Sequence, residues 1–260
     1  MFISRPDAQL FAVAFGNGPG ILVALGGWVG SWELWVEPFA LLSPTWRTIA
    51  YDHRGTGATV APPESITLPS MVEELFAVLD AFTVAQCVLA AESSGAVVAL
   101  QAALQQPARF SGLVVVDGLY HRERPSGADP FVHALQTDFQ ATLGKFVDAC
   151  VPEPEPNSAA IRRWGRQIVG RSSPRAAIQL YECLYGVDLR PQVSQIAQPS
   201  LIVHGDADAF VPISEAEWLA AQIHDSQLII LPGAGRVPTV TLPQAVDSAI
   251  DQFFAAHYLA

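Results

Sequence analysis

The chain has 260 residues, half of them hydrophobic and 15% charged, with a formal net charge of −11. This length fits one large domain, or one domain with an insertion, and excludes two independent domains of ordinary size. The negative charge repels phosphate backbones and anionic lipid surfaces, so we expect no nucleic-acid partner and no membrane partner. Charged residues are scarce against the roughly 25% of an average globular protein, which predicts an apolar pocket or a homo-oligomer contact.

The first residues and the cysteines indicate the compartment. The N-terminal stretch reaches Arg5 and Asp7 before any long apolar run, which fits neither a secretory signal nor a membrane span. Cys87, Cys150 and Cys183 are an odd number without metal-ligand spacing, and they predict buried thiols without an obligatory disulfide. We therefore expect a cytoplasmic protein.

Short apolar runs alternate with helix-like stretches along most of the chain. Most of these runs lack polar alternation, as do strands that are covered on both faces of a parallel sheet. Their order predicts an α/β fold with a doubly wound, mostly parallel sheet and right-handed crossovers. The predicted strands are 11–15, 21–25, 48–51, 87–91, 113–116, 201–203 and 228–231, and the predicted covering helices are 70–82, 94–105, 214–223 and 244–254.

Residues 119–198 interrupt this alternation. They contain no strand-like run, only helical patterns that are joined by proline-rich turns such as residues 151–156. An insertion of about eighty residues between two strands is typical of a lid over the strand ends. We expect residues 1–118 and 199–260 to form the core and 119–198 to form a helical cap inserted in it. The predicted cap helices cover 131–147, 158–169 and 174–185.

A candidate nucleophile lies between a predicted buried strand and an alanine-rich helix, in Ala91-Glu-Ser93-Ser94-Gly95. The pattern small-x-Ser-x-small is typical of a nucleophile elbow. In that turn, strained backbone lifts the serine hydroxyl clear of the sheet, and small flanking residues avoid the neighbouring strands. Ala91 stands in place of the usual glycine, and five-residue patterns also arise by chance. The position between strand and helix favours Ser93 as a nucleophile.

With this motif the chain resembles the α/β-hydrolase superfamily of serine esterases and lactonases, over nearly its whole length. The segment Leu22–Trp35 is similar to the strand and loop that supply one oxyanion-hole donor in that family, with Leu25 where the family usually has histidine. The resemblance implies that backbone N–H groups of Gly27 or Trp28, together with that of Ser94, bind the substrate oxyanion.

Two further segments carry the resemblance. The turn Y-D-H-R-G-T-G resembles the family's D-x-R-G-x-G turn and implies structural roles for His53 and Arg54. The segment 201–212, with H-G-D-A-D in the middle, resembles the strand end that bears the triad acid. It places Asp208 as that acid and Asp206 as a turn residue.

The loop after the last predicted strand contains Arg236 where the family has its catalytic histidine. A guanidinium has a pKa above about 12 and no acceptor atom, so it cannot take the proton of Ser93. Three explanations stay open. The triad is disabled, or Arg236 pairs with Asp208 or with a substrate carboxylate, or another base acts, for which His121 is the candidate.

These residues predict a serine hydrolase-type enzyme for a small apolar ester, lactone or related acyl substrate, impaired by Arg236. No cofactor and no metal are implied. Trp164, with Tyr181 or Tyr185, is expected to supply apolar walls from the cap. The alternatives are a non-catalytic small-molecule binder that kept the pocket, and a lyase or decarboxylase in which Arg236 anchors an anion.

Overall fold

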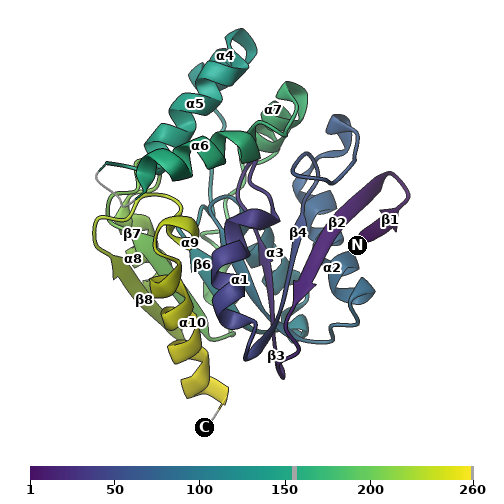
Figure 1. Cartoon of the computed structure of the whole chain (residues 1–260), viewed down its shortest axis with the longest axis vertical. Coiled ribbons are helices and arrows are strands. Elements are labelled where there is room, and N and C mark those ends of the chain that lie inside the picture. Colours follow the sequence, from purple (N-terminus) through teal and green to yellow (C-terminus); the bar gives the residue numbers. More distant parts are fainter. Residues whose placement is uncertain (154–156, 259–260) are drawn as a thin grey trace.

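The computed structural model describes residues 1–153 and 157–258, with side chains up to residue 255. At its centre is an eight-stranded sheet in the order β1-β2-β4-β3-β5-β6-β7-β8 (Figure 1). The strand β2 is antiparallel to both neighbours, and the strands from β4 to β8 along the sheet run parallel. The strands are β1 (Phe2–Arg5), β2 (Ala8–Phe15), β3 (Gly20–Leu25), β4 (Trp46–Asp52), β5 (Cys87–Glu92), β6 (Phe110–Val116), β7 (Ser200–Gly205) and β8 (Ser226–Leu231).

All seven predicted strands are present, and the α/β prediction is confirmed. The sequence did not predict β1, which pairs with β2 at the edge of the sheet. This strand has only four residues, and Phe2 and Ser4 are exposed while Ile3 is buried. So short a strand with one covered face gives too weak an apolar signal to separate it from a turn.

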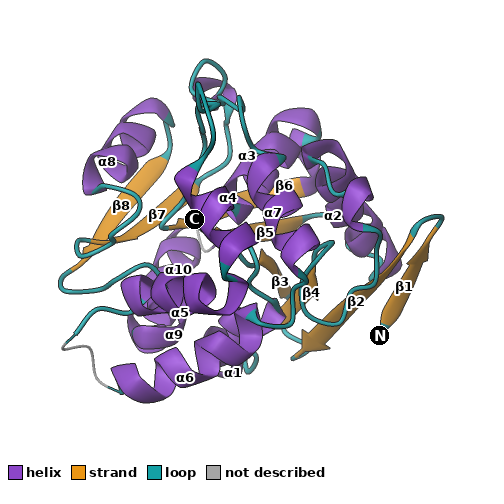
Figure 2. Ribbon diagram, turned by 90° about the horizontal axis from the view of Figure 1, so that it is seen from above, coloured by secondary structure: helices purple, strands orange, loops and turns teal. Residues whose placement is uncertain are grey.

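Helices cover both faces of the sheet (Figure 2). Successive residues of β3 pack into opposite layers: Leu22 and Ala24 join one buried cluster, and Val23 and Leu25 join the other. This alternation, with both sides apolar, explains the continuous hydrophobic runs of the central strands. One layer contains α1 (Val36–Leu42) and α10 (Pro243–Tyr258), and the other contains α2 (Leu68–Ala81), α3 (Gly95–Gln105) and α8 (Ile213–Gln222).

Four further helices lie between β6 and β7 and gather above one end of the sheet (Figure 1). The single helix predicted over 131–147 was wrong, because the chain breaks at Asp138. This residue is extended, and its side chain accepts a hydrogen bond from the Ala141 N–H and caps a new helix. Residues 154–156 of the predicted proline-rich turn lie outside the described residues. The inserted helices are α4 (Pro130–Thr137), α5 (Phe139–Cys150), α6 (Ser158–Val169) and α7 (Pro174–Glu182).

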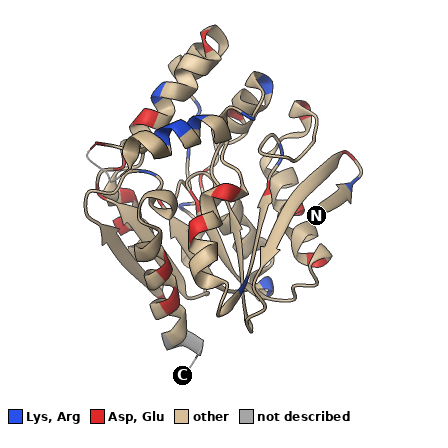
Figure 3. Cartoon of the chain, viewed as in Figure 1, with Lys and Arg blue, Asp and Glu red and all other residues tan. Residues whose placement is uncertain are grey.

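Charged residues are sparse along the ribbon, and basic residues are concentrated on α6 (Figure 3). Arg162 and Arg166 of this helix both form ion pairs with Asp148 of α5. The basic residues of α6 thus fasten two inserted helices together. In the described part of the chain, no helix is both long and apolar enough to cross a membrane.

The cysteines are free thiols. Cys87 and Cys150 are buried, as predicted, whereas Cys183 is only half-buried. Burial raises the pKa of the Cys87 thiol to about 12, so this group stays protonated and unreactive at neutral pH.

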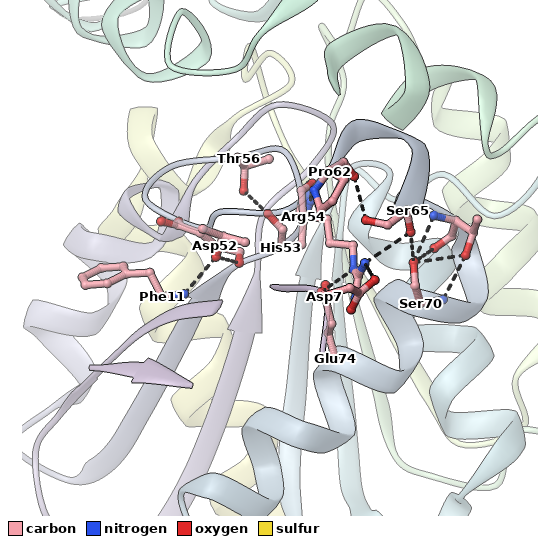
Figure 4. Close-up of polar contacts among 12 residues, drawn as sticks. Asp7, Phe11, Asp52, His53, Arg54, Thr56, Pro62, Ser65, Ser70 and Glu74 are labelled. Carbon is pink, nitrogen blue, oxygen red and sulfur yellow. Dashed lines mark hydrogen bonds and ion pairs between the residues drawn. The ribbon is translucent and has the colours of Figure 1, made fainter. Parts of the chain in front are cut away.

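Arg54, in the turn after β4, is a buried structural cation (Figure 4). Its Nε donates to Glu74 of α2 at 2.5 Å, and its two terminal nitrogens donate to Asp7 at 2.6 and 2.9 Å. The neighbouring His53 is also buried, and its ring contacts the carbonyl oxygens of Gly27 and Arg54, each at 3.1 Å. Burial lowers the pKa of His53, so the ring is neutral and serves as a brace for the loop that contains Gly27.

Candidate active site

Ser93 occupies a sharp turn between β5 and α3. Its φ of 58° is in the left-handed region, where a residue with a side chain is strained. The Ser93 N–H donates to Val116 of β6 at 2.9 Å, and its carbonyl accepts from the Leu119 N–H at 2.9 Å. These bonds hold the turn against the next strand and leave the side chain half-buried rather than enclosed in the sheet.

The loop after β3 packs directly against this serine. A Cβ on Gly27 would lie 2.7 Å from the Cβ and 3.0 Å from the Oγ of Ser93, so only glycine fits there. The adjacent Trp28 is fixed by its indole N–H, which donates to the Ala177 carbonyl of α7 at 2.7 Å. Within the described residues, the backbone N–H groups of Trp28 and Ser94 donate to no protein acceptor. Both groups therefore remain available to a ligand beside Ser93.

Arg236 joins the predicted nucleophile to the predicted acid. Its Nη1 donates to Asp208 Oδ2 at 2.6 Å, and its Nη2 donates to Ser93 Oγ at 2.7 Å. Its guanidinium carbon lies 5.5 Å from the centre of the Phe210 ring. The side chain is only 7% exposed. The guanidinium thus lies between the acid and the serine hydroxyl, as the base of a catalytic triad does, but it can only donate hydrogen bonds.

Three backbone N–H groups help to hold Arg236 and Asp208 in place. The Arg236 N–H donates to the Cys150 carbonyl at the end of α5, at 2.9 Å. Asp208 Oδ1 accepts from the N–H groups of Phe210 and Val211 at 2.8 and 3.3 Å. Each Asp208 oxygen therefore accepts a hydrogen bond. The loop after β8 that contains Arg236, here called the arginine loop, is attached to the inserted helices.

A second buried carboxylate lies beside this group. Asp117, which follows β6, faces His204 of β7 with 3.2 Å between Oδ1 and Nδ1, and both side chains are at most 1% exposed. His204 Nε2 lies 3.0 Å from the Val211 carbonyl and must carry a hydrogen to bond with it, which leaves the Nδ1 lone pair toward Asp117. Burial raises the pKa of Asp117 well above its usual range. His204 Nδ1 and Asp117 Oδ2 have no hydrogen-bond partner among the described residues.

Asp117, His204 and Asp208 bring potential metal-ligand atoms within 4.8 Å of one another in the described part of the chain. Asp117 Oδ1 accepts from the Gly205 N–H at 2.9 Å, and Arg236 neutralises Asp208.

Glu92, the residue before the nucleophile, is a further buried acid. Its Oε2 accepts from the Thr239 hydroxyl at 2.7 Å. Burial raises the pKa of Glu92 to about 7, although the hydrogen bond from Thr239 and the charge of Arg236 act in the opposite direction. In the sequence, Glu92 is only the variable position of the pattern small-x-Ser-x-small, which carries no signal for a buried acid.

The structure places the remaining candidates elsewhere. His121 was considered as an alternative base, but its Nε2 lies 2.9 Å from Glu215 of α8. The hydrogen bond of the Ser93 hydroxyl is made with Arg236 instead. Asp206 accepts from the Gly233 N–H at 2.6 Å, as expected of a turn residue.

Two cavities meet at Ser93 and Arg236. The first, here called the apolar cavity, has a volume of about 70 Å³ and includes Trp164 in its wall. The second, here called the arginine cavity, has a volume of about 350 Å³. Tyr181 lines the arginine cavity, whereas Tyr185, its alternative in the sequence analysis, lines neither. The arginine cavity is lined by Trp28, Ser93, Ser94, Leu119, Arg122, Phe131, Phe146, Tyr181, Phe210, Val211 and Arg236.

The strand order, the strained serine and the loop packed against it define an α/β-hydrolase. The chain belongs to the α/β-hydrolase fold family, whose model matches residues 20–240. It is similar to a pimeloyl-acyl-carrier-protein methyl ester esterase of Nitrosomonas europaea, with 28% identity over 94% of this chain and 99% of the relative.

Further proteins support the same family. The corresponding esterase of Aeromonas hydrophila is 30% identical over 92% of this chain and 96% of the relative. Among solved structures, the enol-lactonase of Burkholderia xenovorans superimposes with a TM-score of 0.89 at 18% identity, covering 98% of this chain and all of that one. The last likeness shows the fold alone.

Proposed function

We propose that the chain is a serine hydrolase for small acyl esters, in which Arg236 keeps turnover far below that of a complete triad. In the reaction, Ser93 Oγ attacks the ester carbonyl, the alcohol leaves, and water then releases the acyl group. The N–H groups of Trp28 and Ser94 are the donors for the tetrahedral oxyanion. The inserted helices act as a cap that provides Trp164 and Tyr181 as pocket walls.

One observation carries this proposal: Arg236 contacts Asp208 and Ser93 Oγ at the same time. Attack by Ser93 requires that its hydroxyl proton move to an acceptor, and the guanidinium has none. A histidine at this position would lie between the same two groups and could take that proton. The site is therefore complete for acyl transfer except for the base.

The test is Arg236→His, assayed with p-nitrophenyl butyrate. We expect kcat/KM to rise by about 10²–10⁴-fold, since a positioned general base contributes about that much. Arg236→Gln is the matched control, because it removes the cation without supplying a base. A His variant that is no faster than the Gln variant would refute the disabled-triad proposal.

The same contact favours a second candidate, a non-catalytic binder of small molecules. A hydroxyl held by a guanidinium donor is a poor nucleophile but a good ligand partner. A fluorophosphonate probe separates the two functions in the unmodified chain. Covalent labelling of Ser93 supports residual hydrolase activity, whereas ligand binding without labelling supports the binder.

A further inference from the structure

Arg122 lines the arginine cavity together with Ser93. Its backbone is fixed on both sides, because its N–H donates to Val187 and its carbonyl accepts from the Gly186 N–H, each at 2.8 Å. Two residues before Arg122, the Tyr120 carbonyl accepts a hydrogen bond from the Leu189 N–H at 3.1 Å. The segment after β6 is thus paired with the segment after α7, and Arg122 is held at the cavity wall.

The guanidinium of Arg122 stacks on the ring of Tyr181, but its charge has no carboxylate partner among the described residues. Its central carbon lies 3.8 Å from the centre of the Tyr181 ring. Its Nη1 is buried and has no hydrogen-bond partner among the described residues. A buried donor without a partner costs free energy, more so when it is charged. Arg122, which lines the arginine cavity, therefore keeps one hydrogen-bond donor that the described residues leave unused.

The acid near Arg122, Asp129, is already engaged. Burial acts to raise the pKa of Asp129, but hydrogen bonds from Tyr185, Val132 and Phe131, and then the charge of Arg122, lower it below its usual value. In the described part of the chain, no carboxylate oxygen lies within 4.0 Å of Arg122. Asp129 Oδ1 caps α4 by accepting from the N–H groups of Phe131 and Val132, and its Oδ2 accepts from the Tyr185 hydroxyl at 2.7 Å. Other arginines do have carboxylate partners: Arg54, Arg109, Arg162, Arg166, Arg171, Arg190 and Arg236.

The charge around the arginine cavity has the sign opposite to that of the protein. Two arginines and no aspartate or glutamate line it, although the chain as a whole carries a formal charge of −11. The charge of Arg236 is neutralised by Asp208. Arg122 is therefore the cavity-lining cation that has no carboxylate partner among the described residues. Leu119, Phe131 and Phe146 supply apolar surface in the same cavity. An anion with a short hydrocarbon chain matches this combination.

We propose that the arginine cavity binds a carboxylate carried by the substrate, with Arg122 as its anchor. The substrate class is then an ester of a short dicarboxylic acid that has one free carboxylate. Its uncharged alcohol group occupies the apolar cavity. This inference rests on the proposed function and specifies its substrate.

The kinetic test uses Arg236→His as the parent enzyme and compares monomethyl adipate with methyl hexanoate, which differ only in the terminal carboxylate. We expect Arg122→Gln to lower the ratio of the two kcat/KM values about tenfold, the effect of one charge-assisted hydrogen bond. Arg122→Lys, which keeps the charge, should lower it less. The matched control is Arg124→Gln, two residues away and outside the cavity, which should leave the ratio within twofold. An equal ratio in Arg122→Gln and its parent would overturn the proposal.

A binding test on the unmodified chain keeps the two proposals apart. Monomethyl adipate at millimolar concentration should raise the Tm, because a ligand that binds only the folded state stabilises it. Arg122→Gln should abolish this shift and Arg124→Gln should retain it. If Arg236→His hydrolyses neither ester while the shift depends on Arg122, the hydrolase proposal fails and the carboxylate site stands. A shift that is the same in Arg122→Gln would refute the carboxylate site.

Discussion

Two buried arginines in this fold show how the same side chain serves different purposes. Arg54 is bound by two carboxylates, those of Glu74 and Asp7, and lines neither cavity at the nucleophile. Arg236 has one carboxylate, that of Asp208, and gives its other hydrogen bond to Ser93. A guanidinium saturated by acids is structural, whereas one that shares its donors with a cavity-lining hydroxyl belongs to a functional site.

The largest expected effect concerns Arg54, the structural arginine of this comparison. Replacing Arg54 with methionine leaves the buried Glu74 without its cation, and removal of one partner from a buried ion pair costs about 3–5 kcal/mol of unfolding free energy. Arg236→Met should cost less, about 1–3 kcal/mol, because Asp208 keeps its two backbone donors. Urea unfolding of both variants measures the difference. The reverse ranking would contradict the contrast between the two arginines.

The acid beside Arg236 gives a pH-dependent prediction. Burial raises the pKa of Glu92 to about 7, from a usual 4.5, so the folded chain keeps a proton that the unfolded chain has released. The native protein should lose stability as the pH rises from 4.5 to 7. Glu92→Gln lacks this equilibrium, so its stability relative to the native chain should rise across the same window, by about 3 kcal/mol in total.

Urea unfolding at several pH values checks the Glu92 prediction. Glu73→Gln, at an exposed position of α2, is the control and should show no such trend. A constant difference between Glu92→Gln and the native chain from pH 4.5 to 8 would mean that Glu92 stays ionised.

The loop after β3 packs closely against Ser93, so a change in this loop tests the functional site around Arg236. Gly27→Ala places a methyl group 2.7 Å from Ser93 Cβ, so the loop or the serine must move. In the Arg236→His background we expect kcat/KM for p-nitrophenyl butyrate to fall at least about tenfold, since loss of one oxyanion donor costs about 10²–10³. Gly127→Ala, whose Cβ would meet nothing within 4 Å, is the control. Equal activity of the two alanine variants would show that the loop does not serve the reaction.

The smallest effect is expected at His121. Because its ring contacts Glu215 rather than Ser93, His121→Ala in the Arg236→His background should change kcat/KM less than about twofold. It should cost less than about 1 kcal/mol, as expected for a partly exposed polar contact. A loss of activity of tenfold or more would restore this histidine as a candidate base.

The sequence predicted the sheet from its apolar runs, and it predicted the nucleophile turn at Ser93 from its small flanking residues. The resemblance to α/β-hydrolases placed Asp208 and Arg236 at the same site. The sequence left open what Arg236 contacts, since that depends on the direction of a long, flexible side chain. It missed Arg122 altogether. The place of Arg122 in the cavity depends on pairing with residues 186–187 and on the ring of Tyr181, about sixty positions along the chain.

The arginine loop is bonded to the end of α5, one of the inserted helices. The Arg236 N–H is bonded to the Cys150 carbonyl, and a Cβ on Gly235 would lie 2.3 Å from the Pro152 ring. Any displacement of the end of α5 would therefore act on the backbone of residue 236, whose side chain donates to the Ser93 hydroxyl.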